Sequence, residues 1–183
     1  MDGVGRIRVL AVWSPDPVMS LLAPVGLASA AGTALVIDRV RRQPQGTGRT
    51  LFDVVNEGPR LDEISPGRPG VATIGAGSLG ASETHEAAQT LASRWPAVVV
   101  RAPSDAWPGP IVPVHVLYGG AVLTWDHGPA VWQPVDGAGR APGPGPMLPR
   151  VAPRMVRHIL RGWLPGPGRW TRAWRQVWGI PWA

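Results

Sequence analysis

Cysteine and lysine are both absent from this sequence of 183 residues, in which all 18 basic residues are arginine. Without cysteine, the chain forms no disulfide and offers no thiolate as nucleophile or metal ligand. Without lysine, it has no P-loop lysine, no Schiff-base amine and no Ser–Lys dyad. These two absences exclude several classes of catalytic and cofactor chemistry.

Acidic residues are absent from residues 150–183, and this segment holds seven arginines. The other eleven arginines and all twelve acidic residues lie in residues 1–149, which are therefore close to neutral. The formal net charge of +6 thus arises in the C-terminal segment. Long apolar runs are absent too, since no stretch reaches the roughly 20 residues that cross a membrane. We expect a cytoplasmic location, with peripheral attachment to the inner face of the membrane as the alternative.

Short apolar and amphipathic segments alternate along the first hundred residues, separated by many of the 24 glycines and 22 prolines. Apolar runs rich in β-branched residues predict strands at residues 7–13, 34–38, 70–74, 97–100, 112–117, 121–125 and 130–135, and the first two are expected to be buried. Helices are expected at residues 19–31, 50–57, 61–64 and 82–95. Thr50 and Ser82 are the expected N-caps, and Gly32 is expected to end the first helix.

The order of these segments predicts an α/β fold with a mostly parallel sheet and covering helices, similar to P-loop NTPases. We place the α/β domain at residues 1–135. Residues 136–149 are rich in glycine and proline and are expected to be a linker. Residues 150–183 are expected to form a short helical tail rich in arginine and tryptophan.

Residues 6–105 resemble the MinD/ParA (CpaE-like) family of deviant-Walker P-loop ATPases. VLAVW, a loop, LLAPVGLASAAG and TALVID are similar to the family's first strand, P-loop, first helix and second strand. TLFDVVNEGPRLDEI and GVATIGAG are similar to its next amphipathic segment and strand. ETHEAAQTLASRW and AVVVRAPSD are similar to the helix and the Asp-x-Pro strand that follow. The resemblance implies the family's fold and a nucleotide site at the first loop.

The catalytic positions depart from the family's pattern. The loop from Ser14 to Ser20 has no glycine, two prolines remove backbone donors from it, and Asp16 would repel a phosphate. Ser20 matches the hydroxyl that binds Mg²⁺, and Asp38 matches the acid after the second strand. Arg101 stands where the family has the acid that ends the later strand. We therefore expect neither ATP binding nor catalysis, and no cofactor or metal.

Arg101 is expected at the carboxyl edge of the sheet, close to Asp38 and Asp16, where an internal ion pair would replace the metal. A second loop, from Gly75 to Gly80, matches G-x-G-x-x-G between a strand and a helix. The acid expected about 20 residues later is missing, because the next strand ends at Arg101. A nucleotide sensor or enzyme that uses this loop is therefore the alternative function.

Tryptophan and arginine recur at helical spacing in residues 150–183, which we expect to carry the contacts of the chain. Basic amphipathic segments of this kind bind partner proteins, anionic membranes or nucleic acid. The expected interaction residues are Arg154, Arg157, Arg161, Trp163, Arg169, Trp170, Arg172, Trp174, Arg175 and Trp178. We expect a partner protein or a second copy of the chain as the occupant. An anionic membrane surface, nucleic acid, and packing of the tail on its own domain are the alternatives.

The sequence thus predicts a non-catalytic pseudo-ATPase that acts as a localisation or assembly factor through its tail. The competing functions are a nucleotide-binding sensor or enzyme and a nucleic-acid-binding protein. The four histidines do not have the spacing of a metal site, and none is assigned a catalytic role.

Overall fold

The computed structural model of the chain describes residues 9–40, 48–60, 65–119, 125, 127–136 and 139–183. Six strands within these residues form one parallel sheet in the order β3-β2-β4-β1-β5-β6. They are β1 (Val9–Trp13), β2 (Ala34–Asp38), β3 (Val71–Gly75), β4 (Val98–Arg101), β5 (Ile111–Leu117) and β6 (Val131–Pro134). The predicted α/β class is confirmed, and the arrangement is consistent with that of P-loop NTPases.

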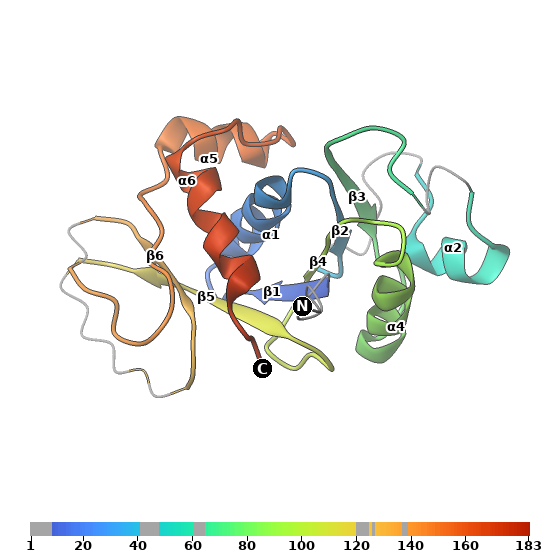
Figure 1. Ribbon diagram of the computed structural model, residues 1–183, viewed down its shortest axis with the longest axis horizontal. Coiled ribbons are helices and arrows are strands. Elements are labelled where there is room, and N and C mark those ends of the chain that lie inside the picture. The colour runs from blue at the N-terminus through green and yellow to red at the C-terminus, as the bar shows by residue number, and fades with distance from the viewer. Residues whose placement is uncertain (1–8, 41–47, 61–64, 120–124, 126, 137–138) are drawn as a thin grey trace, which may run out of the picture.

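Helices cover both faces of this sheet (Figure 1). They are α1 (Pro17–Ala31), α2 (Leu51–Glu57), α4 (Ala81–Leu91), α5 (Pro153–Leu160), α6 (Arg169–Ala173) and the 3₁₀ helix η1 (Trp174–Gly179). Leu10 and Val12 of β1 pack with α1, α5, α6 and η1, whereas Val9 and Ala11 pack with α2 and α4. Successive side chains of a strand point to opposite faces, so the apolar runs of β1, β2 and β4 are buried on both, whereas the edge strand β3 is half-buried to exposed.

Helix α1 begins at Pro17, two residues before the predicted start. The Asp16 carboxylate accepts a hydrogen bond of 2.7 Å from the Met19 N–H and so caps the helix. Proline is well suited to this first turn, because its missing N–H would have no partner inside the helix. Gly32 ends the helix with φ +86°, as predicted.

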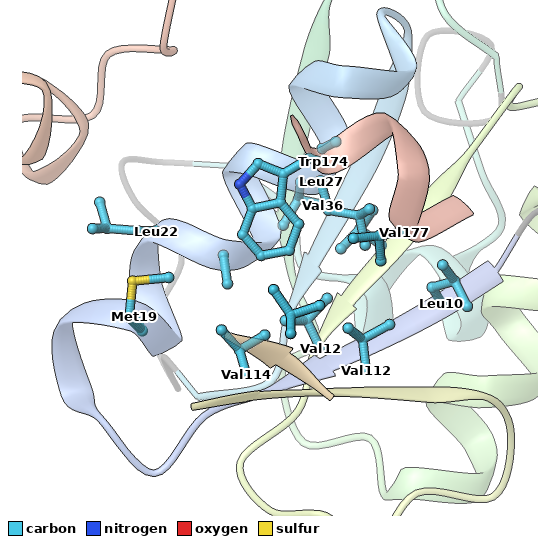
Figure 2. Packing of buried hydrophobic residues seen from close by; sticks show 14 of the residues in the cluster. Leu10, Val12, Met19, Leu22, Leu27, Val36, Val112, Val114, Trp174 and Val177 are labelled. Carbon is cyan, nitrogen blue, oxygen red and sulfur yellow. The ribbon is translucent and has the colours of Figure 1, made fainter. Parts of the chain in front are cut away.

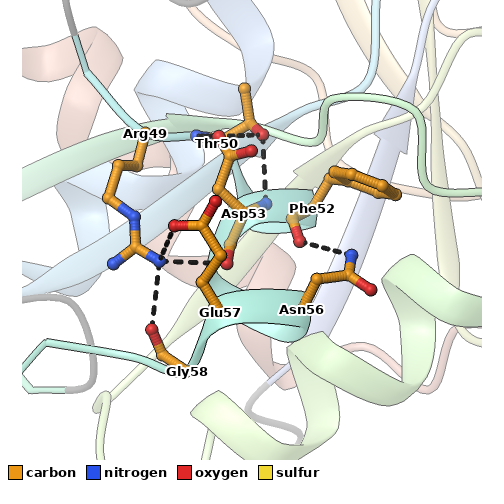
Figure 3. A network of polar contacts seen from close by, with 7 residues as sticks. All are labelled: Arg49, Thr50, Phe52, Asp53, Asn56, Glu57 and Gly58. Atoms are coloured by element: carbon orange, nitrogen blue, oxygen red, sulfur yellow. Dashed lines mark hydrogen bonds and ion pairs between the residues drawn. The ribbon is translucent and has the colours of Figure 1, made fainter.

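Helix α2 begins with the predicted cap Thr50, which forms a capping box with Asp53 (Figure 3). The Thr50 N–H donates to the Asp53 carboxylate at 2.7 Å, and the Asp53 N–H donates to the Thr50 hydroxyl at 3.3 Å. The hydrogen bonds that Thr50 donates hold the pKa of Asp53 below its usual value. At the C-terminal end of α2, the Arg49 side chain donates a hydrogen bond of 3.0 Å to the carbonyl of the C-cap residue Gly58.

Helix α4 corrects one predicted cap. Its N-cap is Gly80 rather than Ser82, because the Glu83 carboxylate reaches back and accepts the Gly80 N–H at 2.7 Å. The helix also ends at Leu91, four residues before the predicted end. The predicted turn at residues 61–64 and most of the predicted strand at residues 121–125 lie outside the described residues.

The glycine- and proline-rich segment is not a free linker, which corrects the prediction for residues 136–149. Its described part runs beside β6, with a parallel bridge between Met147 and Trp132. The carbonyls of Pro144 and Pro146 accept hydrogen bonds of 3.0 and 2.9 Å from N–H groups of the β6 region. Proline has no N–H to donate, but its carbonyl still accepts, so this segment pairs with an edge strand while keeping its prolines.

Candidate functional site

The polar side chains of the loop between β1 and α1 form hydrogen bonds within the loop and with the first turn of α1. The Ser14 hydroxyl accepts the Asp16 N–H at 3.3 Å, and the Asp16 carboxylate caps α1 through Met19. A P-loop needs several free N–H groups aimed at a phosphate at this point. In this chain two prolines remove such donors, and a carboxylate already occupies the start of the helix.

Three of the motif positions predicted from the sequence meet at the carboxyl edge of the sheet. Arg101 ends β4, Asp38 ends β2, and Ser20 lies in the first turns of α1. The Arg101 guanidinium is 3.0 Å from the Asp38 carboxylate, and its Nε and Nη2 each donate to the Ser20 hydroxyl at 3.2 Å. The predicted ion pair with Asp38 is therefore confirmed. Asp16, which was expected to join it, caps α1 instead.

The Arg101 side chain brings a fixed positive charge to this edge of the sheet. Its side chain is 8% exposed and that of Asp38 is 13% exposed, so water screens the pair little. The Ser20 hydroxyl, which the resemblance matches to an Mg²⁺ ligand, and the Asp38 carboxylate are both bonded to this cation. A divalent cation would have to displace a buried like charge in order to bind them.

The segment after α5 covers the Arg101–Asp38 pair. A cavity of about 120 Å³ remains between them, and its wall includes Leu160, Trp163 and Leu164 from the tail. Sites for small ligands usually measure about 300–1,000 Å³. The tail thus leaves little space for a nucleotide at this position.

The loop from Gly75 to Gly80 packs against its own fold. Gly77 has φ +69°, and an added Cβ would lie 2.8 Å from the Thr50 hydroxyl oxygen. The close approach of α2 therefore requires a glycine here. The Gly80 N–H at the start of α4 donates to the Glu83 carboxylate at 2.7 Å, so a carboxylate already lies at the helix N-terminus where a dinucleotide site holds its pyrophosphate.

The inner face of the tail completes the hydrophobic core. The side chains of Trp170 and Trp174 are 2% and 0% exposed, and Trp174 lies among the sheet and α1 residues shown in Figure 2. The Trp170 indole donates to the Gln133 side chain of β6 at 2.8 Å. The half-buried Trp178 donates to the Leu27 carbonyl of α1 at 3.1 Å.

These contacts correct two predictions from the sequence. Trp170 and Trp174 were expected to contact a partner. Both indoles instead pack within their own chain, where they fill the space between α1 and the sheet. The tail was also expected to be separate from residues 1–135. Instead α6 and η1 pack directly on α1, so the two parts share one core.

The outer face of the tail is basic. All of its arginines are exposed, namely Arg150, Arg154, Arg157, Arg161, Arg169, Arg172 and Arg175. Trp163 is 62% exposed and stacks on His158, and Leu160 and Leu164 beside it in sequence are 49% and 44% exposed. We call Leu160, Trp163 and Leu164 the Trp163 patch. Among the predicted interaction residues, the arginines and Trp163 are thus accessible to a partner.

A cluster of aromatic rings around His115 was missed in the sequence. Trp13, Trp125 and Trp132 lie 5.9, 4.3 and 5.5 Å from its ring, measured between centroids. Burial lowers the pKa of His115, because it disfavours the charged imidazolium. The four residues come from separate segments, and their spacing in the sequence carries no signal for such a cluster.

Gln133 was missed for a different reason. Its side chain is 1% exposed, and it accepts from Trp170 while donating to the carbonyls of Pro134 and Pro149 at 3.0 and 3.1 Å. A single glutamine within an apolar strand was the available signal, since a buried amide needs partners. This side chain joins β6, the glycine- and proline-rich segment and the tail.

The described residues lack two further features. They contain no group of three or more His, Cys, Asp or Glu side chains placed to hold a metal ion. None of the helices in that part of the chain has both the length and the apolar character needed to span a bilayer.

Comparison of the chain with models of known protein families, with curated proteins and with solved structures finds no match. The relationship to the MinD/ParA family therefore stays a prediction from the sequence.

Proposed function

We propose that this chain is a non-catalytic relative of the MinD/ParA ATPases that acts as a localisation or assembly factor. In this proposal the α/β body is a scaffold, and the outer face of the tail binds a partner protein. The observation that carries the non-catalytic part is the contact of Arg101 with both Ser20 and Asp38. An internal cation at this point takes the place of the metal on which phosphoryl transfer depends.

The docking part of the proposal is supported by the composition of the outer face. Trp and Arg are the residues that most often dominate the energy of protein interfaces. The Trp163 patch is exposed beside Arg161, and residues 150–183 contain no acid that would neutralise the arginines. The favoured occupant is therefore a partner protein with an apolar pocket in an acidic surface, since such a surface complements both features.

The nucleotide-sensor alternative has less support. The Gly75–Gly80 loop offers its Gly80 N–H to Glu83 rather than to a ligand, and the Glu83 carboxylate would repel a phosphate. We expect calorimetry of the full chain with Mg²⁺-ATP to show no saturable heat. Binding with a micromolar dissociation constant would contradict the non-catalytic proposal.

The docking part is tested with Trp163→Ala in the full chain. Because Trp163 is 62% exposed, the variant should keep the free energy of unfolding within about 0.5 kcal/mol of the wild type. It should nevertheless fail to bind the proposed partner, so a protein that co-purifies with the wild type should be missing from the purified variant. Phe52→Ala is the matched control, since this other exposed aromatic residue lies on α2, away from the tail.

Three further measurements identify the occupant. Sedimentation detects self-association, flotation with anionic vesicles detects membrane binding, and titration with nucleic acid at rising salt detects the remaining alternative. Retention of the co-purifying protein by Trp163→Ala would contradict the proposal. Trp163-dependent binding only to vesicles or only to nucleic acid would contradict the choice of a partner protein.

A further inference from the structure

A second cavity lined by described residues lies apart from the Arg101–Asp38 pair. It measures about 800 Å³ and opens between the start of α1, the ends of β5 and β6, and α5. Its apolar wall includes Val18, Met19, Leu22, Val116, Val151 and Val156. This volume falls within the range of sites for small organic ligands.

The strand order places this cavity at the switch point of the sheet. From β1 the chain passes through α1 to β2 on one side, whereas from β5 it continues to β6 on the other side. The crevice between the carboxyl ends of β1 and β5 is therefore flanked by connections that leave in opposite directions. Asp16 follows β1 and Tyr118 follows β5, and both line the cavity. Open parallel sheets bind ligands at such points.

Four charged side chains line the cavity, and three of them have partners within the protein. Asp16 accepts the Met19 N–H at 2.7 Å and the Tyr118 hydroxyl at 3.4 Å. Asp136 and Arg150 pair with each other at 3.6 Å. Arg157 of α5 has no hydrogen bond or ion pair from its side chain to any of the described residues.

We propose that this cavity binds a small amphipathic acid. The apolar part of the ligand lies between α1 and α5, and its carboxylate faces Arg157, the one cationic group on the wall without a partner among the described residues. A polyphosphate does not fit this chemistry, because Asp16 stands at the helix start and most of the wall is apolar. This site is separate from the Trp163 patch, whose residues do not line the cavity.

The proposal is tested with decanoate, decanol and decylamine, which share an apolar chain and differ in the head group. Calorimetry of the full chain below the critical micelle concentration should show saturable binding of decanoate. Decanol and decylamine should bind at least about tenfold more weakly, since a hydrogen-bonded charge pair contributes about that factor. Equal affinity for the three compounds, or no saturable binding of decanoate, would overturn the proposal.

Two variants locate the binding. Arg157→Gln should bring the affinity for decanoate down to that for decanol, whereas Arg172→Gln, on the exposed side of α6, should leave the preference unchanged. Ala152→Trp, which adds an indole to the cavity wall, should abolish binding of all three compounds. A thermal melt verifies that each variant is folded. Preference for decanoate that survives in folded Arg157→Gln would overturn the assignment of the carboxylate to Arg157.

Discussion

At the scale of single residues, Arg101 shows how one cation is accommodated at the edge of an apolar sheet. It donates to a carboxylate and to a hydroxyl, so its charge is both paired and hydrogen-bonded. Burying such a group without partners costs several kcal/mol. Asp38 and Ser20 together therefore offset the cost of burying the Arg101 guanidinium at this position.

Arg101→Ala is expected to lower the free energy of unfolding by about 3–5 kcal/mol, because it removes the guanidinium that pairs with the nearly buried Asp38 carboxylate. Chemical denaturation measures this loss. Arg150→Ala is the control, since the pair of Arg150 with Asp136 is largely exposed and should contribute less than about 1 kcal/mol. Similar small losses in the two variants would contradict a structural role for the buried pair.

The contact between Arg101 and Asp38 was predictable from the sequence. Both residues end apolar strands, and the carboxyl ends of parallel strands meet at one edge of a sheet. The role of Asp16 was not predictable from the same reasoning. Its carboxylate has a partner closer in sequence, the Met19 N–H, and this local hydrogen bond directs it away from Arg101.

At the scale of elements, α1 depends on a glycine in its interior. Pro24 and Gly26 both disfavour a helix, yet α1 continues through them to Ala31. An added Cβ at Gly26 would lie 2.5 Å from the Trp174 Nε1 and 2.6 Å from a ring carbon of Trp170. Tertiary packing of the two indoles thus outweighs the helix propensity of this residue.

Gly26→Ala is expected to destabilise the protein by about 1–3 kcal/mol, although alanine alone would favour the helix by up to about 1 kcal/mol. The two buried indoles have little room to move, so the tail should loosen from α1. Chemical denaturation and limited proteolysis of the tail measure the two effects.

Gly179→Ala is the matched control for Gly26→Ala. No described atom outside the neighbouring residues lies within 4 Å of a Cβ added at Gly179, so its stability should change by less than about 0.5 kcal/mol. If Gly26→Ala stabilised the protein and left the tail resistant to protease, the close packing of α1 and the tail would be contradicted.

Tertiary contacts also outweigh the local sequence signal in the glycine- and proline-rich segment. Its composition is typical of a linker, because proline interrupts helices and most strands. The carbonyls of Pro144 and Pro146 nevertheless accept from the unpaired edge of β6, and Leu148 is 1% exposed. Composition indicates which bonds proline cannot donate, but it does not show where an edge strand needs acceptors.

At the scale of the whole molecule, the tail is part of one of the two helical layers. With α1, it covers the face of the sheet that carries Leu10, Val12 and Val112. Removing the tail would expose this face, including the surface that Trp174 and Val177 bury. A single buried tryptophan contributes about 3–5 kcal/mol, which is comparable with much of the stability of a small domain.

A chain that ends at Pro149 is therefore expected to lose cooperative unfolding. Circular dichroism in the near and far ultraviolet, followed during a thermal melt, measures this loss. The full chain with Trp163→Ala is the control and should melt as the wild type does, because that indole is exposed. A truncated chain with native spectra and a sharp transition would show that residues 1–149 fold alone.

The alternation of apolar strands with helices, the cap at Thr50 and the end of α1 at Gly32 were determined by the sequence itself, since these signals are local. The absence of glycine and lysine from the first loop was also visible there. Which face of the tail is buried depended on the tertiary structure. Trp170 and Trp163 belong to the same basic segment, yet one packs on Gly26 of α1 and the other faces solvent. Contacts between residues far apart in the chain decide that difference, and composition cannot encode it.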